Sequence, residues 1–119
     1  MGKYFLLKEN TFEEVEIVDT YTEAEMLLKC DHLDFATCPG GYGLIVDDSG
    51  VIKGRPVNNI ASSYYRGSGP ICGDAILCKY VVKYGSGEFA SFKEDELFDE
   101  TSVLQRAYER LKEFLESEE

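Results

Sequence analysis

A broad apolar stripe near the C-terminus constrains the fold of this chain more than any other feature. From position 103 onward, apolar residues recur every three or four positions, as on one face of an α-helix. So wide an apolar face has to be buried, and a sheet offers a surface of that width. We therefore predict a C-terminal helix, capped by Thr101 or Ser102, that packs on a sheet. Its stripe consists of Val103, Leu104, Ala107, Tyr108, Leu111, Phe114 and Leu115.

Short apolar runs upstream predict the strands of that sheet. Lys3–Glu9 and Phe12–Val18, the second with apolar residues two apart, indicate an N-terminal hairpin. Ile71–Lys79 is the candidate for the central strand, and Tyr80–Lys83 continues it. Further strands are predicted at Leu33–Cys38, at Tyr42–Asp47 and, after an Asp- and Gly-rich turn, at Val51–Lys53.

Two shorter helices are also expected. Thr22–Glu25 has the pattern of a capping box, which predicts a helix from Glu23 to about Cys30. Its inner face would carry Met26 and Leu27 in addition to Cys30. The second helix is predicted within Val57–Tyr65, with Ile60, Ala61 and Tyr64 facing inward.

These elements together define the fold class. We predict one α+β domain over residues 1–119, with a mixed, mostly antiparallel sheet, two to three helices and the C-terminal helix packed on the sheet. No internal repeat or linker divides the chain. The last glutamates, at 116, 118 and 119, are expected to form a short acidic tail.

Negative charge is the most unusual bulk property. Twelve Lys and Arg stand against 23 Asp and Glu, which gives a formal net charge of −11. Such a surface repels nucleic acids and anionic membranes and favours basic partners, although the charge could also serve solubility alone. The densest acidic segment would form an interaction surface of Glu94, Asp95, Glu96, Asp99 and Glu100.

No apolar segment has the length of a signal peptide core or of a membrane span, so we expect a cytoplasmic protein with reduced cysteines. Cys72 and Cys78 are six residues apart, which would place both on one face of a strand as core residues. The alternative is a zinc site that they complete with Cys30, His32 and Cys38, although the spacings match no standard zinc motif.

Catalytic and cofactor motifs are not apparent. His32 is the only histidine, so any Ser-His or Cys-His mechanism would depend on it. The glycine-rich stretches 39–43 and 67–69 lack the context of a P-loop or a dinucleotide-binding turn. We therefore expect a non-enzymatic protein without a cofactor.

Four polar residues are the candidates for ligand binding: Asn58, Asn59, Arg66 and Asp74. An asparagine amide both donates and accepts hydrogen bonds, so it can bind a ligand or, more commonly, connect two loops. Arg66 would be the contact for a phosphate, because its planar fork matches one.

The middle of the chain carries a family resemblance. The segments 43–61 and 69–77 combine an apolar strand, an acidic turn, a Gly-x-Pro-x-Asn segment and an Ile-x-Gly-Asp strand. This pattern, over about Gly43–Lys79, resembles the bacterial and phage family known as domain of unknown function three-eight-four-six. Because no catalysis is assigned to the family, the resemblance implies no mechanism. The occurrence of the family in phages and mobile elements favours a partner-binding or host-modulating role. The residues that fall on the pattern are Gly50, Gly54, Pro56, Asn58, Gly73 and Asp74.

Two functions from different classes follow. The first is a non-enzymatic module that binds a protein with a basic surface, and whose carboxylates could mimic nucleic acid. The alternative is a small-molecule or nucleotide-binding domain that uses the segments Gly54–Asn59 and Ile71–Asp74.

Overall fold

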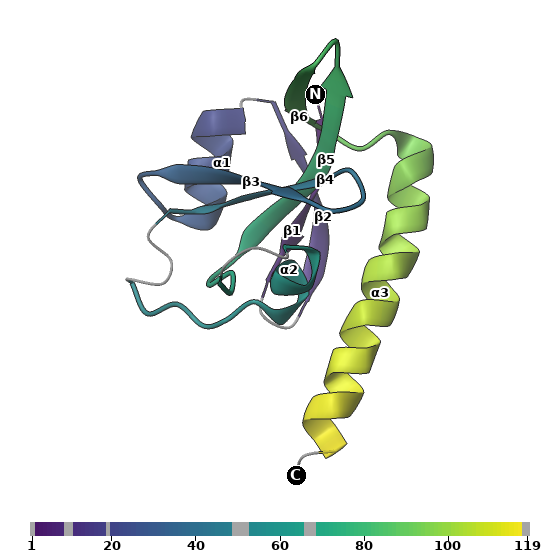
Figure 1. The fold of residues 1–119 in the computed structure, drawn as a ribbon. Coiled ribbons are helices and arrows are strands. Elements are labelled where there is room, and N and C mark those ends of the chain that lie inside the picture. The colour runs from purple at the N-terminus through teal and green to yellow at the C-terminus, as the bar shows by residue number, and fades with distance from the viewer. Residues whose placement is uncertain (1, 9–10, 19, 49–52, 66–68, 118–119) are drawn as a thin grey trace.

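The computed structural model describes residues 2–8, 11–18, 20–48, 53–65 and 69–117, which form six strands and three helices around one sheet (Figure 1). This confirms the predicted fold class. The elements are β1 (Gly2–Leu7), β2 (Phe12–Ile17), α1 (Thr20–Leu28), β3 (Leu33–Cys38), β4 (Tyr42–Asp47), α2 (Asn59–Tyr64), β5 (Ala75–Lys83), β6 (Ser86–Ala90) and α3 (Glu94–Ser117).

The sheet has the order β2-β1-β5-β4-β3, and every described pairing is antiparallel. The predicted N-terminal hairpin is the β1–β2 pair, and the predicted central strand is β5. β1 and β6 share one edge of β5: β1 pairs with its first residues and β6 with Lys79–Lys83. A bridge between Lys3 and Phe92 links β1 to the segment after β6.

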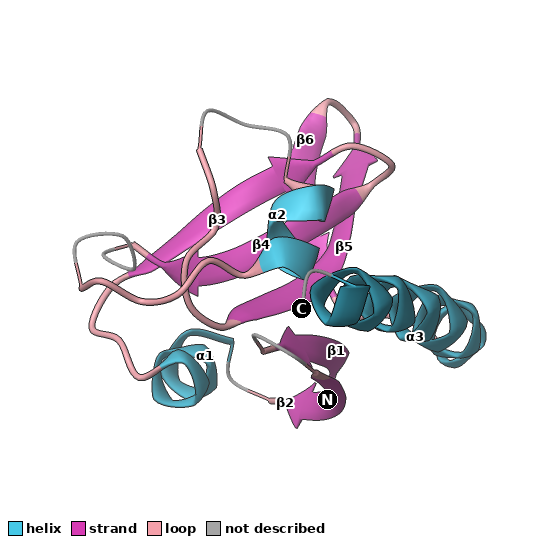
Figure 2. Ribbon diagram, turned by 90° about the horizontal axis from the view of Figure 1, so that it is seen from below, coloured by secondary structure: helices cyan, strands magenta, loops and turns pink. Residues whose placement is uncertain are grey.

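Alternation of side chains along the strands divides the core into two layers. Leu7, Leu44 and Leu77 belong to the layer that packs under α2 and α3. Leu6 and Ile76 belong to the other layer, which packs under α1. Figure 2 shows α1 and α3 on opposite sides of the sheet. Among the described residues, no helix is long and apolar enough to cross a membrane.

α1 begins earlier than predicted. It starts at Thr20, so Thr22 lies inside the helix and the predicted capping box is wrong. The Glu23 carboxylate instead accepts a hydrogen bond from the Val18 amide at 3.1 Å. The inner face of the helix also differs from the prediction. Ala24 and Leu28, which are one turn apart, are buried, whereas Met26 is 73% exposed.

α3 also begins earlier, at Glu94 rather than after Thr101. Its first turn is acidic, as the helix dipole favours, and the Lys93 amide donates to Glu96 Oε1 at 2.9 Å. The Thr101 hydroxyl donates to the carbonyl oxygen of Leu97, one turn earlier, so it caps nothing.

The apolar stripe of α3 does pack on the sheet. Leu104 and Tyr108 are buried, whereas Val103 is 43% exposed and Phe114 is 58% exposed. These two therefore lie at the margins of the stripe. The helix continues through Ser117, so residue 116 is helical rather than part of a tail, and residues 118–119 lie outside the described residues.

Two strand predictions need correction. In the predicted strand Val51–Lys53, Lys53 lies in a turn and the other two residues lie outside the described residues. β5 begins at Ala75, after Gly73 with its φ of 87°, so Cys72 precedes the strand and does not share a face of it with Cys78. Cys78 is buried in the layer under α1, and Cys72 is half-buried in a bridge to Val57.

Candidate functional site

Asn58 lies at the centre of the segment from which ligand binding was predicted. It is 1% exposed and is the N-cap of α2, where its Oδ1 accepts from the Ala61 amide at 3.0 Å. Its Nδ2 donates to the carbonyl oxygens of Leu7 at 2.9 Å and Gly73 at 3.1 Å. Both donors of the amide are therefore used within the protein. This geometry favours the loop-tying role over ligand recognition.

Arg55, which the sequence analysis did not single out, ties the same segment to α1. Its guanidinium donates to the carbonyl oxygens of Leu28 and Lys29, both at 2.9 Å, at the end of α1. It also pairs with Asp47 Oδ2 at 3.1 Å, and Lys53 Nζ pairs with the same oxygen at 3.0 Å. The Asp47 side chain is 2% exposed, so these two cations compensate a buried carboxylate.

A pocket of about 230 Å³ is lined by two of the four predicted ligand residues, Asn58 and Asp74. Arg55, Lys29 and Gly73 also line it. Because Asn58 and Arg55 are engaged by backbone and carboxylate groups, the half-buried Asp74 and the exposed Lys29 are the polar side chains left for a ligand. Asn59 is exposed, and Arg66 lies outside the described residues.

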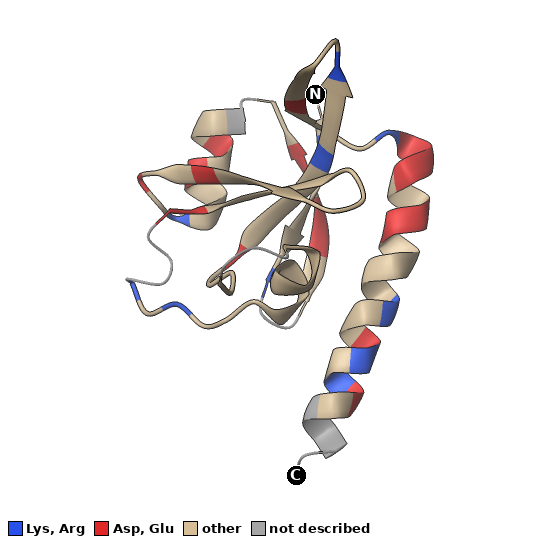
Figure 3. Cartoon of the chain, viewed as in Figure 1, with Lys and Arg blue, Asp and Glu red and all other residues tan. Residues whose placement is uncertain are grey.

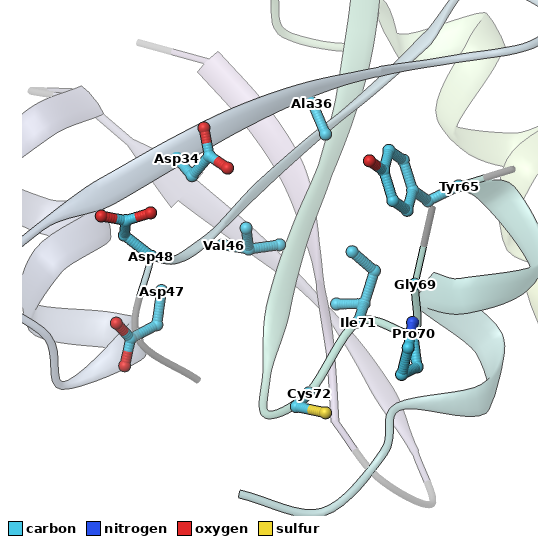
Figure 4. A pocket seen from close by; sticks show the side chains of 10 residues that line it. All are labelled: Asp34, Ala36, Val46, Asp47, Asp48, Tyr65, Gly69, Pro70, Ile71 and Cys72. Carbon is cyan, nitrogen blue, oxygen red and sulfur yellow. The ribbon is translucent and has the colours of Figure 1, made fainter. Parts of the chain in front are cut away.

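A second pocket, of about 220 Å³, lies between strands β3 and β4 and the segment 69–72 (Figure 4). Asp34 and Asp48 lie on one wall, and Tyr65 and Ile71 face them from the other. Asp34 pairs with Val46 in the sheet, which makes Asp48 its diagonal neighbour. Two adjacent carboxylates repel phosphate, so this pocket does not suit the predicted nucleotide.

The predicted acidic surface divides into an outer and an inner part. Glu94, Asp95 and Asp99 are exposed, and no Lys or Arg among the described residues lies within ion-pair distance of them. We call these three, with the neighbouring Phe98, the outer face of α3. The red turns at the start of α3 in Figure 3 show this concentration of acids. Phe98 is 77% exposed, so an unburied aromatic ring lies among three uncompensated carboxylates.

The inner part faces the sheet. Glu96 Oε2 pairs with Lys79 Nζ at 2.9 Å, and the pKa of Glu96 is lowered, first by the hydrogen bond from the Lys93 amide and then by Lys79. Glu100 is only 4% exposed, so its prediction as a surface residue is wrong. Its Oε2 accepts from the Tyr64 hydroxyl at 3.3 Å.

The cysteines are free thiols. Burial raises the pKa of Cys38 to about 11 and that of Cys78 to about 12, which leaves both protonated at neutral pH. Burial, followed by the nearby Asp47 carboxylate, also raises the pKa of Cys30. His32 is exposed, and within the described ranges no three His, Cys, Asp or Glu side chains are grouped as a metal site.

Comparison with known families extends the resemblance seen in the sequence. The family model described as "Domain of unknown function (DUF3846)" matches residues 3–105, far more than the central segment. The chain belongs to this family. No curated protein and no solved structure matches the chain.

Within this DUF3846 chain, three pattern residues are linked by hydrogen bonds: Asn58 Nδ2 donates to the Gly73 carbonyl oxygen, and the Gly73 amide donates to the Pro56 carbonyl oxygen. Gly73 has a φ of 87°, and a Cβ atom there would lie 2.8 Å from Arg55 Cδ, so a larger residue would be strained and would require the Arg55 side chain to move. Gly54 has a φ of 70°, and Gly50 lies outside the described residues. The outer face of α3 lies inside the matched range, and residues 106–117 of α3 lie beyond it.

Proposed function

We propose that this protein acts by binding, not by catalysis, and that the outer face of α3 binds a protein with a basic surface. The observation that carries the proposal is the exposure of Phe98 among Glu94, Asp95 and Asp99. Aromatic residues, Phe included, are enriched in protein interfaces, and the rim around the interface core is polar. The net charge of −11 favours a basic partner and would accelerate its association.

A host-modulating role for a phage or mobile element, in which the carboxylates mimic nucleic acid, is the finer form of this proposal. It is supported by the exposed carboxylates on the first turns of α3, which could replace phosphates in a basic cleft. The cytoplasmic location predicted from the sequence is part of the same proposal.

The test uses two variants that have the same net charge. In the outer-face variant, Glu94→Gln, Asp95→Asn and Asp99→Asn remove three carboxylates from the proposed surface. In the control variant, three exposed glutamates elsewhere are replaced by glutamine, at Glu88, Glu109 and Glu113. Both variants and the wild type are used to capture proteins from a host lysate at low and high salt, and retained proteins are identified by mass spectrometry.

We expect a basic protein that the wild type and the control variant retain at low salt and that the outer-face variant does not retain. Phe98→Ser should abolish retention as well, whereas Tyr84→Ser, at a fully exposed tyrosine, should not. Equal loss in both triple variants would mean that net charge alone attracts the protein, and the proposed surface would then be wrong.

A further inference from the structure

A cleft of about 230 Å³ opens on the inner side of α3, next to the outer face. It lies between the first turns of the helix and the sheet residues of β4 and β5. Its walls include aromatic rings, three carboxylates and one lysine. The lining residues are Tyr42, Lys79, Phe92, Glu96, Asp99, Glu100 and Val103.

Glu100 is the residue that gives this cleft a chemical preference. It lines the cleft and is 4% exposed, its Oε2 accepts a hydrogen bond from the Tyr64 hydroxyl, and the Tyr42 hydroxyl also interacts with the carboxylate. Oε1 is buried without a hydrogen-bond partner among the described residues. A buried carboxylate oxygen without a donor is costly, and a donor that enters the cleft would remove that cost.

The charge balance of the cleft also favours a cation. Lys79 Nζ pairs with Glu96 at 2.9 Å and lies 5.9 Å from the centre of the Tyr42 ring. The cleft thus already accommodates one cation between a carboxylate and an aromatic face. The carboxylates of Asp99 and Glu100 have no such cation in the described part of the chain, so the cleft keeps an excess of negative charge.

We propose that this cleft receives an arginine side chain of the partner, whose guanidinium donates to Glu100 and Asp99 beside the Tyr42 ring. Arginine fits better than lysine, because a planar guanidinium can satisfy a carboxylate with two hydrogen bonds and can lie against an aromatic face. The inference rests on the proposed function for the identity of the partner. The cleft and its preference for a cation stand on the structure alone.

The test titrates the isotope-labelled protein with Nα-acetyl-arginine methylamide and follows its NMR spectrum. The neutral isostere Nα-acetyl-citrulline methylamide is the matched control, because it has the same shape without the charge. We expect the signals of Val103 and Tyr42 to shift with the arginine compound, and roughly tenfold weaker binding of the citrulline compound. Equal binding of both compounds, or shifts confined to other residues, would overturn the inference.

Three variants assign the binding to the cleft. Glu100→Gln should remove it, whereas Glu94→Gln, the same charge change on the outer face, should leave it intact. Val103→Trp should block entry at the rim without changing charge, and it provides the test if thermal unfolding shows that Glu100→Gln does not fold. Binding that survives Val103→Trp in the folded protein would contradict the proposed position.

The failure of this inference can be distinguished from the failure of the proposed function. Asp99 belongs to both sites, so the double variant Glu94→Gln, Asp95→Asn separates them. If the arginine compound does not bind but the double variant still loses partner capture, only the cleft is wrong. If the compound binds in the cleft and the double variant keeps capture, the proposed surface is wrong.

Discussion

Removing the amide of Asn58 should destabilise the fold far more than removing the amide of its neighbour Asn59. In Asn58→Ala, α2 loses its N-cap, which contributes about 1 kcal/mol to stability. The carbonyl oxygens of Leu7 and Gly73 each lose a hydrogen bond worth about 0.5–1.5 kcal/mol. The expected loss is therefore about 2–4 kcal/mol.

The assay is urea or thermal unfolding followed by circular dichroism. At this chain length, 1 kcal/mol corresponds to a change in Tm of about 4 °C, so Asn58→Ala should lower Tm by roughly 8–16 °C. Asn59→Ala, at an exposed site, should change stability by about 0.5 kcal/mol or less. If the two variants had equal stability, the reasoning that Asn58 is a structural joint would be refuted.

Asn58→Asp separates the two tasks of this side chain. The carboxylate keeps the oxygen that accepts from the Ala61 amide, but it can no longer donate to the carbonyl oxygens of Leu7 and Gly73. At neutral pH this variant should be at least as unstable as Asn58→Ala, because a buried charge faces two carbonyl oxygens. Near wild-type stability would show that Asn58 only caps α2.

Three further outcomes are expected. Tyr108→Phe removes the hydrogen bond to the Lys8 carbonyl oxygen (2.8 Å) and should cost about 1 kcal/mol in urea unfolding, whereas Tyr84→Phe, fully exposed, should cost nothing measurable. The pKa of Glu96 is lowered in the folded state, so its ionised carboxylate stabilises the fold at pH values above its pKa in the unfolded chain, and this contribution is lost as pH falls through the folded pKa. Unfolding measured as a function of pH should therefore show that Glu96→Gln is less stable than the wild type by about 0.2–1 kcal/mol near neutral pH. The free energy of unfolding of the variant should fall less than that of the wild type as the pH is lowered. In thiol labelling at pH 7, the half-buried Cys72 should react first, and Cys78, with its pKa of about 12, only on unfolding; early labelling of Cys78 would contradict this.

The strands of the sheet could be predicted well because their local signals agree. β3 and β4 were predicted with their observed limits, since the turn-forming glycines 40 and 41 separate them and β4 is an apolar run that ends at aspartates. The core face of α3 was also predicted, from the period of Leu104 and Tyr108. These features depend on residues close in the sequence.

The beginning of α3 was missed because its first turns are almost entirely acidic and resemble a polar loop. Leu97 is the inward-facing residue there, and it has the same helical period as Glu100 and Leu104. That period could have placed Glu100 on the buried side, but a glutamate is usually exposed. The partners of its carboxylate come from β4 and α2, which the local sequence does not indicate.

The hydrogen bonds by which Asn58 connects Leu7, Gly73 and Ala61 were only partly predictable. The loop-tying role followed from the chemistry of the amide, but its partners Leu7 and Gly73 are 51 and 15 residues away. Arg55 was missed for the same reason, because it binds the end of α1 across 27 residues. Long-range contacts of this kind become visible only in the folded chain.

The most direct test of the proposed function is the salt dependence of the dissociation constant for the captured partner. It should be measured for the wild type, the outer-face variant and the control variant over a series of salt concentrations. We expect the outer-face variant to bind more weakly and to show a shallower dependence on salt than the control variant, because three carboxylates no longer contact the partner. The same affinity and the same salt dependence in both triple variants would contradict binding through the outer face of α3.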